Sequence, residues 1–196
     1  MNTNQVPNLL PYQGEVFLYQ SFFSVEESDV LLQQLYEEIP WKQEPIRIFG
    51  KEVMQPRLTA WAGDLDKAYA YSGITMQPID WTPALRIIKD RIDPDDRFTN
   101  VLLNLYRDGQ DAMGWHRDNE KILGTNPVVA SVSLGASRLF QFRHYTDKKL
   151  VRSIELTHGS VLLMQGETQH YWEHRIPRTT QATEPRINLT FRTLYS

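Results

Sequence analysis

One histidine and one carboxylate stand two residues apart in this chain, at His116 and Asp118. On an extended segment, side chains two residues apart point to the same face, so both groups could bind one side of a metal ion. A second histidine from elsewhere in the chain would complete the 2-His-1-carboxylate triad that non-haem Fe(II) oxygenases use. The rest of the sequence must therefore supply that histidine.

Four other histidines are candidates for this third ligand. His158 precedes a glycine and is typical of a turn, and His144 lies in a short basic run, so structural or exposed positions are expected for both. His170 and His174 are separated by an even number of residues, which would place them on one face of a strand. Spacing alone does not choose between these two.

The run from residue 186 to residue 192 alternates polar and apolar side chains, as a strand with two different faces does. The apolar face comprises Ile187, Leu189 and Phe191, and the polar face comprises Arg186, Asn188, Thr190 and Arg192. The polar face could be a solvated surface. Its two guanidinium groups also suit a small dicarboxylate, because arginine binds carboxylates through paired hydrogen bonds.

The second half of the chain consists of short β-rich runs punctuated by Gly, Asp and Pro. We expect strands at residues 98–107, 128–134, 138–143, 150–156, 160–165, 168–175 and 186–194. Many short strands at this spacing are typical of a barrel or a double-sheet jelly roll. In the first of them Asn104 and Tyr106 share one face, so they could help to hold the same anion as the arginines.

The first half is expected to form helices that buttress one sheet. Ser24 and Glu27 form a capping box at the start of a helix that ends before Pro40. The apolar residues at helical spacing within it are Val30, Leu31, Leu35, Tyr36 and Ile39. A second helix is predicted to start at Thr82, with Pro83 at its first position. It carries Leu85, Ile88 and Ile92 inward.

Between these helices the chain is expected to run in extended segments. Residues 45–62 are predicted to be extended around a turn at Gly50, with Phe49 near its tip. An alternative is that Phe49 folds back on the core. Further along, Tyr69 and Tyr71 share one face of an extended segment.

Composition narrows the class of protein. A chain of 196 residues with 41% hydrophobic and 23% charged residues fits one domain (1–196). We expect a mainly β fold with flanking helices (α+β), in which residues 1–97 supply the helices and extended segments and residues 98–196 form the β-rich core. Because there are no cysteines, disulfides, zinc fingers and Fe–S clusters are excluded. The net charge of −3 favours nucleic-acid binding only through a local basic patch. Without a signal peptide or an apolar run that could span a membrane, an intracellular protein with no membrane partner is expected.

Three motifs together resemble the AlkB family of Fe(II)- and 2-oxoglutarate-dependent dioxygenases. The motifs run from Asn104 to Asp118, from Trp172 to Pro177, and from Arg186 to Arg192. Their order, spacing and residue types all agree with the family, and the similarity extends from about Ile46 to the C-terminus. Within the family the chain is most similar to the nuclear human homologues that repair alkylated DNA, the second more than the third.

The resemblance implies a double-stranded β-helix fold and assigns roles to the residues of the site. His116, Asp118 and His174 would bind iron and form the catalytic centre, which leaves His170 as a neighbour. The residues that would hold 2-oxoglutarate are Arg186 at the distal carboxylate, assisted by Asn104, Tyr106 and Asn188, with Thr190 and Arg192 near the metal-bound end.

The resemblance also implies a nucleotide-recognition lid in the first half. Phe49 would push into duplex DNA from a hairpin, and wedges of this kind promote unstacking. The lid would comprise Tyr69, Tyr71 and Ser72, with the second tyrosine stacking on a flipped base. Arg57 and Glu120 correspond to polar contacts in the base pocket.

Two features differ from these relatives. The segment between Arg143 and Arg152 is short, and the loop after Pro177 carries few basic residues, so fewer phosphate contacts and a weaker grip on duplex DNA are expected. Asn119 also replaces an acidic residue that commonly follows the metal-binding aspartate.

The implied activity is oxidative demethylation of 1-methyladenine and 3-methylcytosine in alkylated DNA, single- or double-stranded, with RNA as a further candidate substrate. It requires Fe(II), 2-oxoglutarate and dioxygen, and releases formaldehyde, succinate and carbon dioxide. The alternatives are an Fe(II)/2-oxoglutarate hydroxylase of a protein or small molecule, and a catalytically silent nucleic-acid binder. A monomer is expected, in the cytoplasm of a bacterium or the nucleus of a eukaryote.

Overall fold

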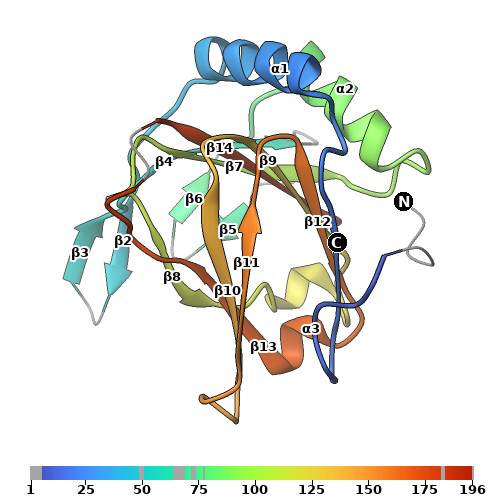
Figure 1. The fold of residues 1–196 in the computed structure, drawn as a ribbon. Helices are drawn as coiled ribbons and strands as arrows, with labels where there is room; N and C mark the ends of the chain where they lie inside the picture. The colour runs from blue at the N-terminus through green and yellow to red at the C-terminus, as the bar shows by residue number, and fades with distance from the viewer. Residues whose placement is uncertain are drawn as a thin grey trace.

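Two antiparallel β-sheets packed on each other form the centre of the structure, which is a computed structural model (Figure 1). The structure describes residues 6–48, 51–63, 69–71, 74–76, 78–181 and 184–195. The larger sheet has the strand order β1-β12-β9-β14-β7-β4, and the smaller sheet has the order β11-β10-β13-β8. The predicted jelly-roll core, mainly β with flanking helices, is confirmed.

The bounds of the strands agree closely with most of the predicted β-rich runs. The larger sheet contains β1 (Glu15–Tyr19), β4 (Leu58–Gly63), β7 (Asn100–Tyr106), β9 (Val129–Gly135), β12 (Ser160–Gln165) and β14 (Arg186–Arg192). The smaller sheet contains β8 (Met113–His116), β10 (Arg138–His144), β11 (Val151–Leu156) and β13 (Trp172–Ile176). Because β14 lies between β9 and β7, its polar face is central in the larger sheet.

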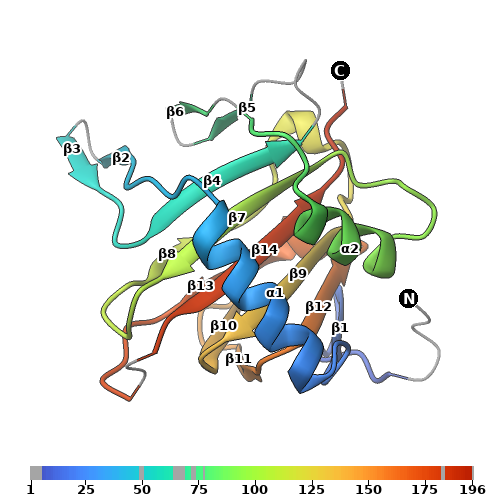
Figure 2. The ribbon, with the colours of Figure 1, turned by 90° about the horizontal axis from the view of Figure 1, so that it is seen from above.

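The alternation along β14 separates two hydrophobic clusters. Ile187, Leu189 and Phe191 join the cluster that the larger sheet shares with helices α1 (Val25–Glu38) and α2 (Pro83–Ile92). Both helices cover the outer face of that sheet (Figure 2). The second cluster contains residues of both sheets, among them Tyr106, Phe142 and Trp172. The polar residues of β14 therefore face the smaller sheet.

Both predicted helices are present, and their caps follow from the sequence. The Ser24 side chain accepts a hydrogen bond from Glu27 N–H while the Glu27 carboxylate accepts one from Ser24 N–H. The Thr82 side chain caps α2 at Leu85 N–H. Leu31, Leu35 and Ile39 in and after α1 are buried, as are Leu85, Ile88 and Ile92 in α2.

Two of the apolar residues at helical spacing in α1, Val30 and Tyr36, do not face the core. Val30 is 56% exposed and Tyr36 is 51% exposed. Each of the two residues is next to a buried leucine in the sequence. Because an α-helix has 3.6 residues per turn, neighbouring side chains lie about 100° apart around the helix. The buried stripe of α1 is therefore narrower than its apolar content suggests.

A second difference concerns the strand predicted at residues 168–175. Its first four residues form the short helix α3 (Thr168–Tyr171), and only Trp172 onward is extended. Thr168 Oγ1 donates to the Gln165 carbonyl and accepts from Glu15 N–H, which fixes a helical turn in place of a strand. His170 and His174 therefore do not share one strand face. His170 is exposed and pairs with Asn126 Oδ1 at 2.8 Å.

The smaller elements of the first half are two hairpins. One pairs β2 (Pro45–Ile48) with β3 (Lys51–Met54), and the other pairs β5 (Tyr69–Tyr71) with β6 (Ile74–Met76). Phe49 and Ser72 lie outside the described residues. A 3-10 helix, η2 (Lys121–Leu123), follows the His116 segment. Among the described residues, no helix combines the length and apolar character that crossing a membrane requires.

Candidate metal and anion site

Two strands of the smaller sheet bring together His116, Asp118 and His174. His116 ends β8, Asp118 follows two residues later, and His174 lies opposite His116 in the neighbouring strand β13. One ligand atom from each residue lies within 4.8 Å of the others. Of the two histidines that spacing left open, His174 completes the triad, because strand pairing and not sequence distance decides the position.

The donor atoms of the triad are those that a metal ion needs. His116 Nδ1 lies 2.9 Å from the Gly114 carbonyl, so a proton on Nδ1 leaves Nε2 as the ligand atom. His174 Nδ1 and Asp118 Oδ2 are buried and have no hydrogen-bond partner among the described residues. Buried polar atoms are nearly always satisfied, so these two atoms are suited to a ligand. Two imidazoles and one carboxylate fit Fe(II).

The electrostatics of the triad keep its members in the metal-binding protonation state. Burial lowers the pKa of His174 to about 3, and nearby positive charge contributes; burial likewise lowers the pKa of His116. Burial alone would raise the pKa of Asp118, but Arg192 and the two histidines outweigh it and lower the value to about 2. At neutral pH the site offers two neutral imidazoles and a carboxylate.

Three side chains hold the triad in place. Arg192 Nη2 donates to Asp118 Oδ1 at 2.9 Å, and both side chains are almost fully buried. Gln169, from α3, accepts the Asp118 backbone N–H through Oε1 at 2.9 Å. Phe140 stacks on the His174 ring, with 5.4 Å between ring centroids and 18° between planes. Gln169 and Phe140 were missed by sequence reasoning, because no periodicity marks a contact between distant elements.

The polar face of β14 is buried, so its interpretation as a solvated surface is wrong. Arg186 is 1% exposed and donates from Nη2 to Ser133 Oγ at 2.9 Å. Its Nε and Nη1 have no hydrogen-bond partner in the part of the chain that the structure describes. Burial lowers the pKa of Arg186 to about 10, so the guanidinium stays charged at neutral pH. A buried guanidinium with unused N–H donors requires an anionic partner. A carboxylate is suited to this, because its two oxygens match two parallel N–H groups of the guanidinium.

The other predicted anion-site residues line one cavity together with the triad. Asn188 donates to Ser131 Oγ at 2.7 Å, and Thr190 Oγ1 donates to Asn188 Oδ1 at 3.3 Å. The Tyr106 ring lies 5.2 Å from the Arg186 guanidinium carbon. The cavity between the sheets is lined, among others, by Asn104, Tyr106, His116, Asp118, His174, Asn188, Thr190 and Arg192. Ser131 and Ser133 were missed, although the alternation within β9 marks them as a polar face.

The structure describes the side chains of only two of the predicted substrate-binding residues, Arg57 and Glu120. Arg57 is buried and donates from Nε to Asn104 Oδ1 at 2.6 Å, which joins it to the anion end of the cavity. Glu120 is half-buried, and its Oε2 has no hydrogen-bond partner within the described ranges. The side chains of Tyr69 and Tyr71 are not described, and Phe49 and Ser72 lie outside the described residues.

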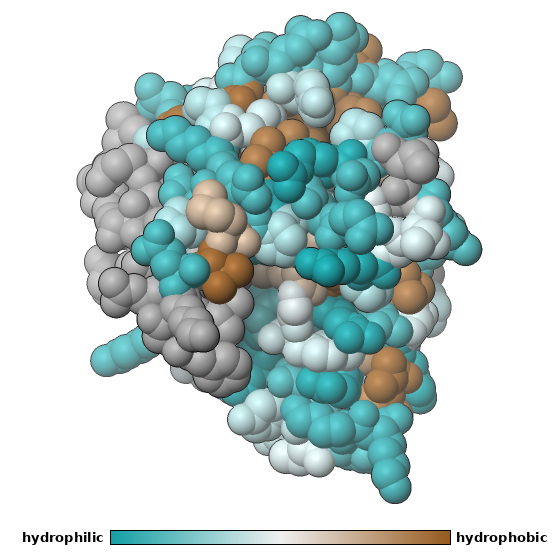
Figure 3. Space-filling model, turned by 90° about the vertical axis from the view of Figure 1, so that its left-hand side faces the viewer, coloured by the Kyte–Doolittle hydropathy of each residue, from teal (hydrophilic) through white to brown (hydrophobic). Residues whose placement is uncertain are grey.

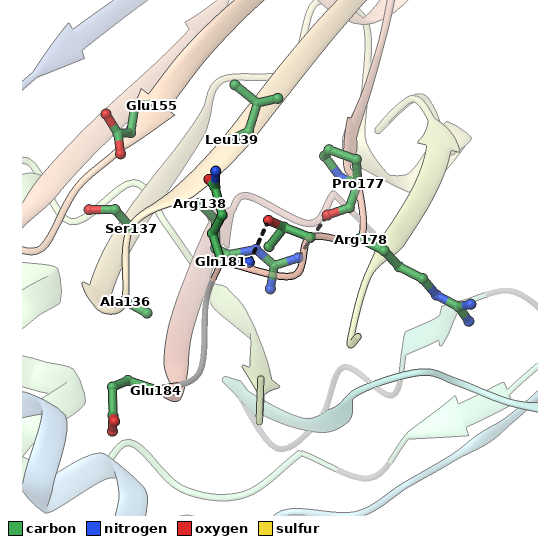
Figure 4. A pocket seen from close by; sticks show the side chains of 10 residues that line it. Ala136, Ser137, Arg138, Leu139, Glu155, Pro177, Arg178, Gln181 and Glu184 are labelled. Atoms are coloured by element: carbon green, nitrogen blue, oxygen red, sulfur yellow. Dashed lines mark hydrogen bonds between the residues drawn. The ribbon is translucent and has the colours of Figure 1, made fainter. Parts of the chain in front are cut away.

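A larger surface pocket of about 580 Å³ lies at the end of β10 and contains none of the triad (Figure 4). Arg138 is buried in its wall and donates to the carbonyls of Asp108, Asp111 and Pro177. These contacts tie the loop before β8 to the end of β13. Glu155, Arg178 and Glu184 give the pocket walls mixed charge. Arg138 therefore braces β8 and β13, the two strands that carry the triad. Among the described lining residues, the pocket has no set of histidine and carboxylate ligands comparable to the triad.

Comparison with known proteins gives one consistent result. The 2OG-Fe(II) oxygenase superfamily model matches residues 15–192. Human alpha-ketoglutarate-dependent dioxygenase alkB homolog 3 is 44% identical over 194 residues, which cover 93% of this chain and 67% of that protein. Human DNA oxidative demethylase ALKBH2 is 37% identical, over 89% of this chain and 71% of that protein. The chain is therefore more similar to the third human homologue than to the second, and the expectation of the reverse order is wrong.

A solved structure supports the fold by an independent route. The structure of OsALKBH1 superposes with a TM-score of 0.65 and covers 91% of this chain and 97% of that chain. Its sequence identity is 20%, so it bears on the fold alone. The jelly-roll arrangement thus persists where most side chains differ.

Proposed function

This chain belongs to the AlkB family within the 2OG-Fe(II) oxygenase superfamily, and from that premise we propose that it repairs N-alkylated bases in nucleic acid by oxidative demethylation. It is an Fe(II)- and 2-oxoglutarate-dependent dioxygenase. The observation that carries the proposal is one cavity lined both by the triad and by the polar face of β14. On that face the buried Arg186 has N–H groups, on Nε and Nη1, that find no partner among the described residues.

His116, Asp118 and His174 would hold the iron, and Arg186 would pair with the distal carboxylate of 2-oxoglutarate. Asn104, Tyr106 and Asn188 would orient that end of the cosubstrate, while Thr190 and Arg192 lie nearer the metal. When bound, Fe(II) and 2-oxoglutarate supply the dioxygen-derived oxidant, with succinate and carbon dioxide as co-products. The chain's own contribution is to fix these ligands in a cavity lined by preorganised polar groups before the reaction begins.

The proposed substrates are 1-methyladenine and 3-methylcytosine. Hydroxylation of the methyl carbon creates an N–CH₂OH group, whose N–C bond breaks to release formaldehyde and the unmodified base. Bases methylated at these nitrogens are cations, which an aromatic face such as that of Tyr71 attracts. The relatives whose names include DNA oxidative demethylase support a methylated DNA substrate.

Access to such a base requires that it leave the stack. Phe49 would open the duplex, Tyr69, Tyr71 and Ser72 would cover the base, and Arg57 and Glu120 would contact its edge. The face that carries β2, β3 and β8 is mostly hydrophilic, with separate hydrophobic residues (Figure 3). Such a surface suits a polar polymer more than an apolar ligand.

The proposal is tested by mass spectrometry of oligonucleotides that carry one methylated base. Methylated single-stranded DNA, duplex DNA and RNA are compared side by side with the wild-type chain, each with and without 2-oxoglutarate. On at least the single-stranded DNA we expect a mass loss of about 14 units, the mass of one CH₂ group, because demethylation replaces a methyl group by a hydrogen atom. This loss should require 2-oxoglutarate. If none of the three polymers loses its methyl group while succinate still forms, the proposed demethylation is contradicted, and the hydroxylase of a protein or small molecule becomes the function to test.

A further inference from the structure

A β-bulge lies in β8, immediately before the triad residue His116. His116 pairs with His174 of β13. Three residues earlier, Met113 pairs with Ile176, which is only two residues from His174, so two residues of β8 oppose one of β13. The two strands lie side by side in Figure 2. Met113 and His116 both line the cavity, although residues three apart on a regular strand point to opposite faces. The bulge therefore turns His116 toward the cavity.

The backbone alone gives this bulge little support. β8 is an edge strand of the smaller sheet, and two registered pairs join it to β13. Gly114, the first residue of the bulge, does not have a positive φ, and an added Cβ would meet no described atom within 4 Å. A need for glycine at this position therefore does not impose the bulge. The second bulge residue, Trp115, is the one whose side chain reaches other strands.

Trp115 joins β8 to β10 and β13 through its indole ring. The guanidinium carbon of Arg143 in β10 lies 4.2 Å from the ring centre, and that of Arg175 in β13 lies 4.4 Å from it. Arginine stacks on aromatic faces and is attracted by their electrons. Arg175 follows one histidine of the triad and Trp115 precedes the other, so the contact joins the neighbours of both histidines. We call Trp115, Arg143 and Arg175 the tryptophan clamp.

Both arginines of the clamp are held by acceptors beyond the ring. Arg143 donates to Glu173 Oε2 from Nε at 3.0 Å and from Nη2 at 2.8 Å. Arg175 donates from Nε to Gln141 Oε1 at 2.8 Å. Hydrogen bonds that involve a charged group are stronger than those between neutral groups. The two guanidinium groups are therefore fixed points against which the ring of Trp115 packs.

The bulge also determines how the imidazole of His116 is oriented. His116 Nδ1 lies 2.9 Å from the Gly114 carbonyl, so the contact that orients the ring spans the bulge itself. This carbonyl belongs to the peptide bond that Gly114 shares with Trp115, so a shift of the Trp115 backbone would move it relative to the imidazole. Contacts of this kind, outside the ligand set, orient ligands and tune the bound metal.

We propose that Trp115 is a positioning residue, which aims His116 at the metal by holding the bulge of β8 in place. Trp115 is not among the described residues that line the cavity, so it acts through His116. The inference rests on the proposed function in one respect, because it takes the triad as the site of the resident metal. Loss of the ring is expected to weaken metal binding and alter the coordination geometry. It should not abolish binding, since Asp118 and His174 remain.

Titration of the metal-free chain with Co(II), followed by visible absorption, tests the proposal. The titration gives the affinity, and the cobalt bands at saturation report the coordination geometry. Trp115→Leu is expected to bind Co(II) about 10-fold more weakly than the wild type, with altered bands, as for other contacts outside a ligand set. Trp115→Phe keeps an aromatic face for the arginines and should restore most of the affinity and the spectrum.

The matched control is Trp41→Leu, because Trp41 is also half-buried but packs against the cluster that the larger sheet shares with α1 and α2. This variant should keep the affinity and the spectrum of the wild type.

Wild-type affinity and spectrum in Trp115→Leu would overturn the proposal even if the variant unfolded more easily, because Trp115 would then be structural only. Equal losses in Trp115→Leu and Trp115→Phe would also overturn it, since the aromatic face would then play no part. If Trp115→Leu does not fold, Arg175→Met decides, because it removes one cation from the clamp and leaves the ring. Weaker Co(II) binding is expected in this variant, and wild-type binding would overturn the proposal. The titration contains no oligonucleotide and no turnover, so a failure of the proposed demethylation would not alter its reading.

Discussion

Among the described residues, Asp118 makes more hydrogen bonds than either histidine of the triad. Its carboxylate is fixed by Arg192, and its backbone N–H is fixed by the Gln169 side chain. Gln169 in turn donates from Nε2 to Met164 Sδ at 3.7 Å, so both ends of its amide are engaged. We infer that Gln169 is a positioning residue, which acts on the metal through Asp118.

Replacement of Gln169 by leucine is expected to weaken metal binding. The variant leaves the buried Asp118 N–H without an acceptor, and outer contacts of this kind typically contribute about 10- to 100-fold in metal affinity. Titration of the metal-free chain with Mn(II), followed by electron paramagnetic resonance, measures the loss. Gln33→Leu on the exposed face of α1 serves as the control. Equal Mn(II) affinity in the Gln169 variant and the wild type would show that the contact is structural only.

At the scale of single residues, the sequence predicted what alternation and spacing encode. The two faces of β14 and the pair formed by His116 and Asp118 follow from period two. The choice of His174 over His170 does not, because it depends on a helical turn at Thr168 and on the pairing of β13 with β8. Roles of Phe49 and Ser72 stay predictions, since both lie outside the described residues.

Among the elements, α1 shows most directly how a local signal fixes a boundary. The Ser24–Glu27 capping box satisfies two backbone N–H groups at the helix start. The helix then packs against the larger sheet, whose opposite face carries the anion site. The stability of α1 therefore supports the sheet that positions Arg186.

Ser24→Ala is expected to lower the free energy of unfolding by about 1 kcal/mol, because an alanine cannot accept the Glu27 N–H bond. Ser24→Asp, which keeps an acceptor at the cap, should stay close to the wild type. Chemical denaturation followed by circular dichroism measures both variants. An equal loss in the two would mean that the cap itself contributes nothing.

Helix starts were predictable because capping is local, whereas the helical turn at α3 was not. Thr168 is held by Glu15, which is 153 residues away in sequence. The bond exists only once β1 has paired with β12, so no window of sequence around Thr168 contains it. The same reason explains why the stacking of Phe140 on His174 went unnoticed.

Across the whole molecule, the loop from Arg107 to Asp111 connects the two sheets. The Asp111 carboxylate accepts three bonds from Arg107, at 2.7 to 2.9 Å, and Arg138 binds the carbonyls of Asp108 and Asp111. Burial alone would raise the pKa of Asp111, but the bonds and charge of Arg107 outweigh it and lower the pKa. The loop therefore depends on an ionised carboxylate.

This dependence predicts an acid sensitivity. Because the folded-state pKa of Asp111 lies below the unfolded value of about 3.9, its stabilisation is present above that pH and is lost as the pH falls through the folded value. Asp111→Asn should be less stable than the wild type at neutral pH and lose less on acidification below about pH 4. Urea unfolding across this pH range measures both effects, with the exposed Asp108→Asn as control. Parallel stability curves for Asp111→Asn and the wild type would contradict the assignment.

For the whole molecule, the sequence predicted the jelly-roll fold and the net charge of −3, but not where the charged side chains gather on the surface. Arg143 of β10 and Arg175 of β13 both lie over the ring of Trp115 in β8, so these two cations come together only after the strands have paired. The expectation of few phosphate contacts stays a prediction.

The central claim is that the triad and Arg186 together perform oxidative demethylation of a base. Its most direct test measures succinate, formaldehyde and restored adenine in one reaction on a single-stranded oligonucleotide with one 1-methyladenine. Equal amounts of the three products are expected from the wild-type chain, and none from His116→Ala. Succinate formation without formaldehyde or restored adenine, on this substrate and on its 3-methylcytosine counterpart, would contradict the account.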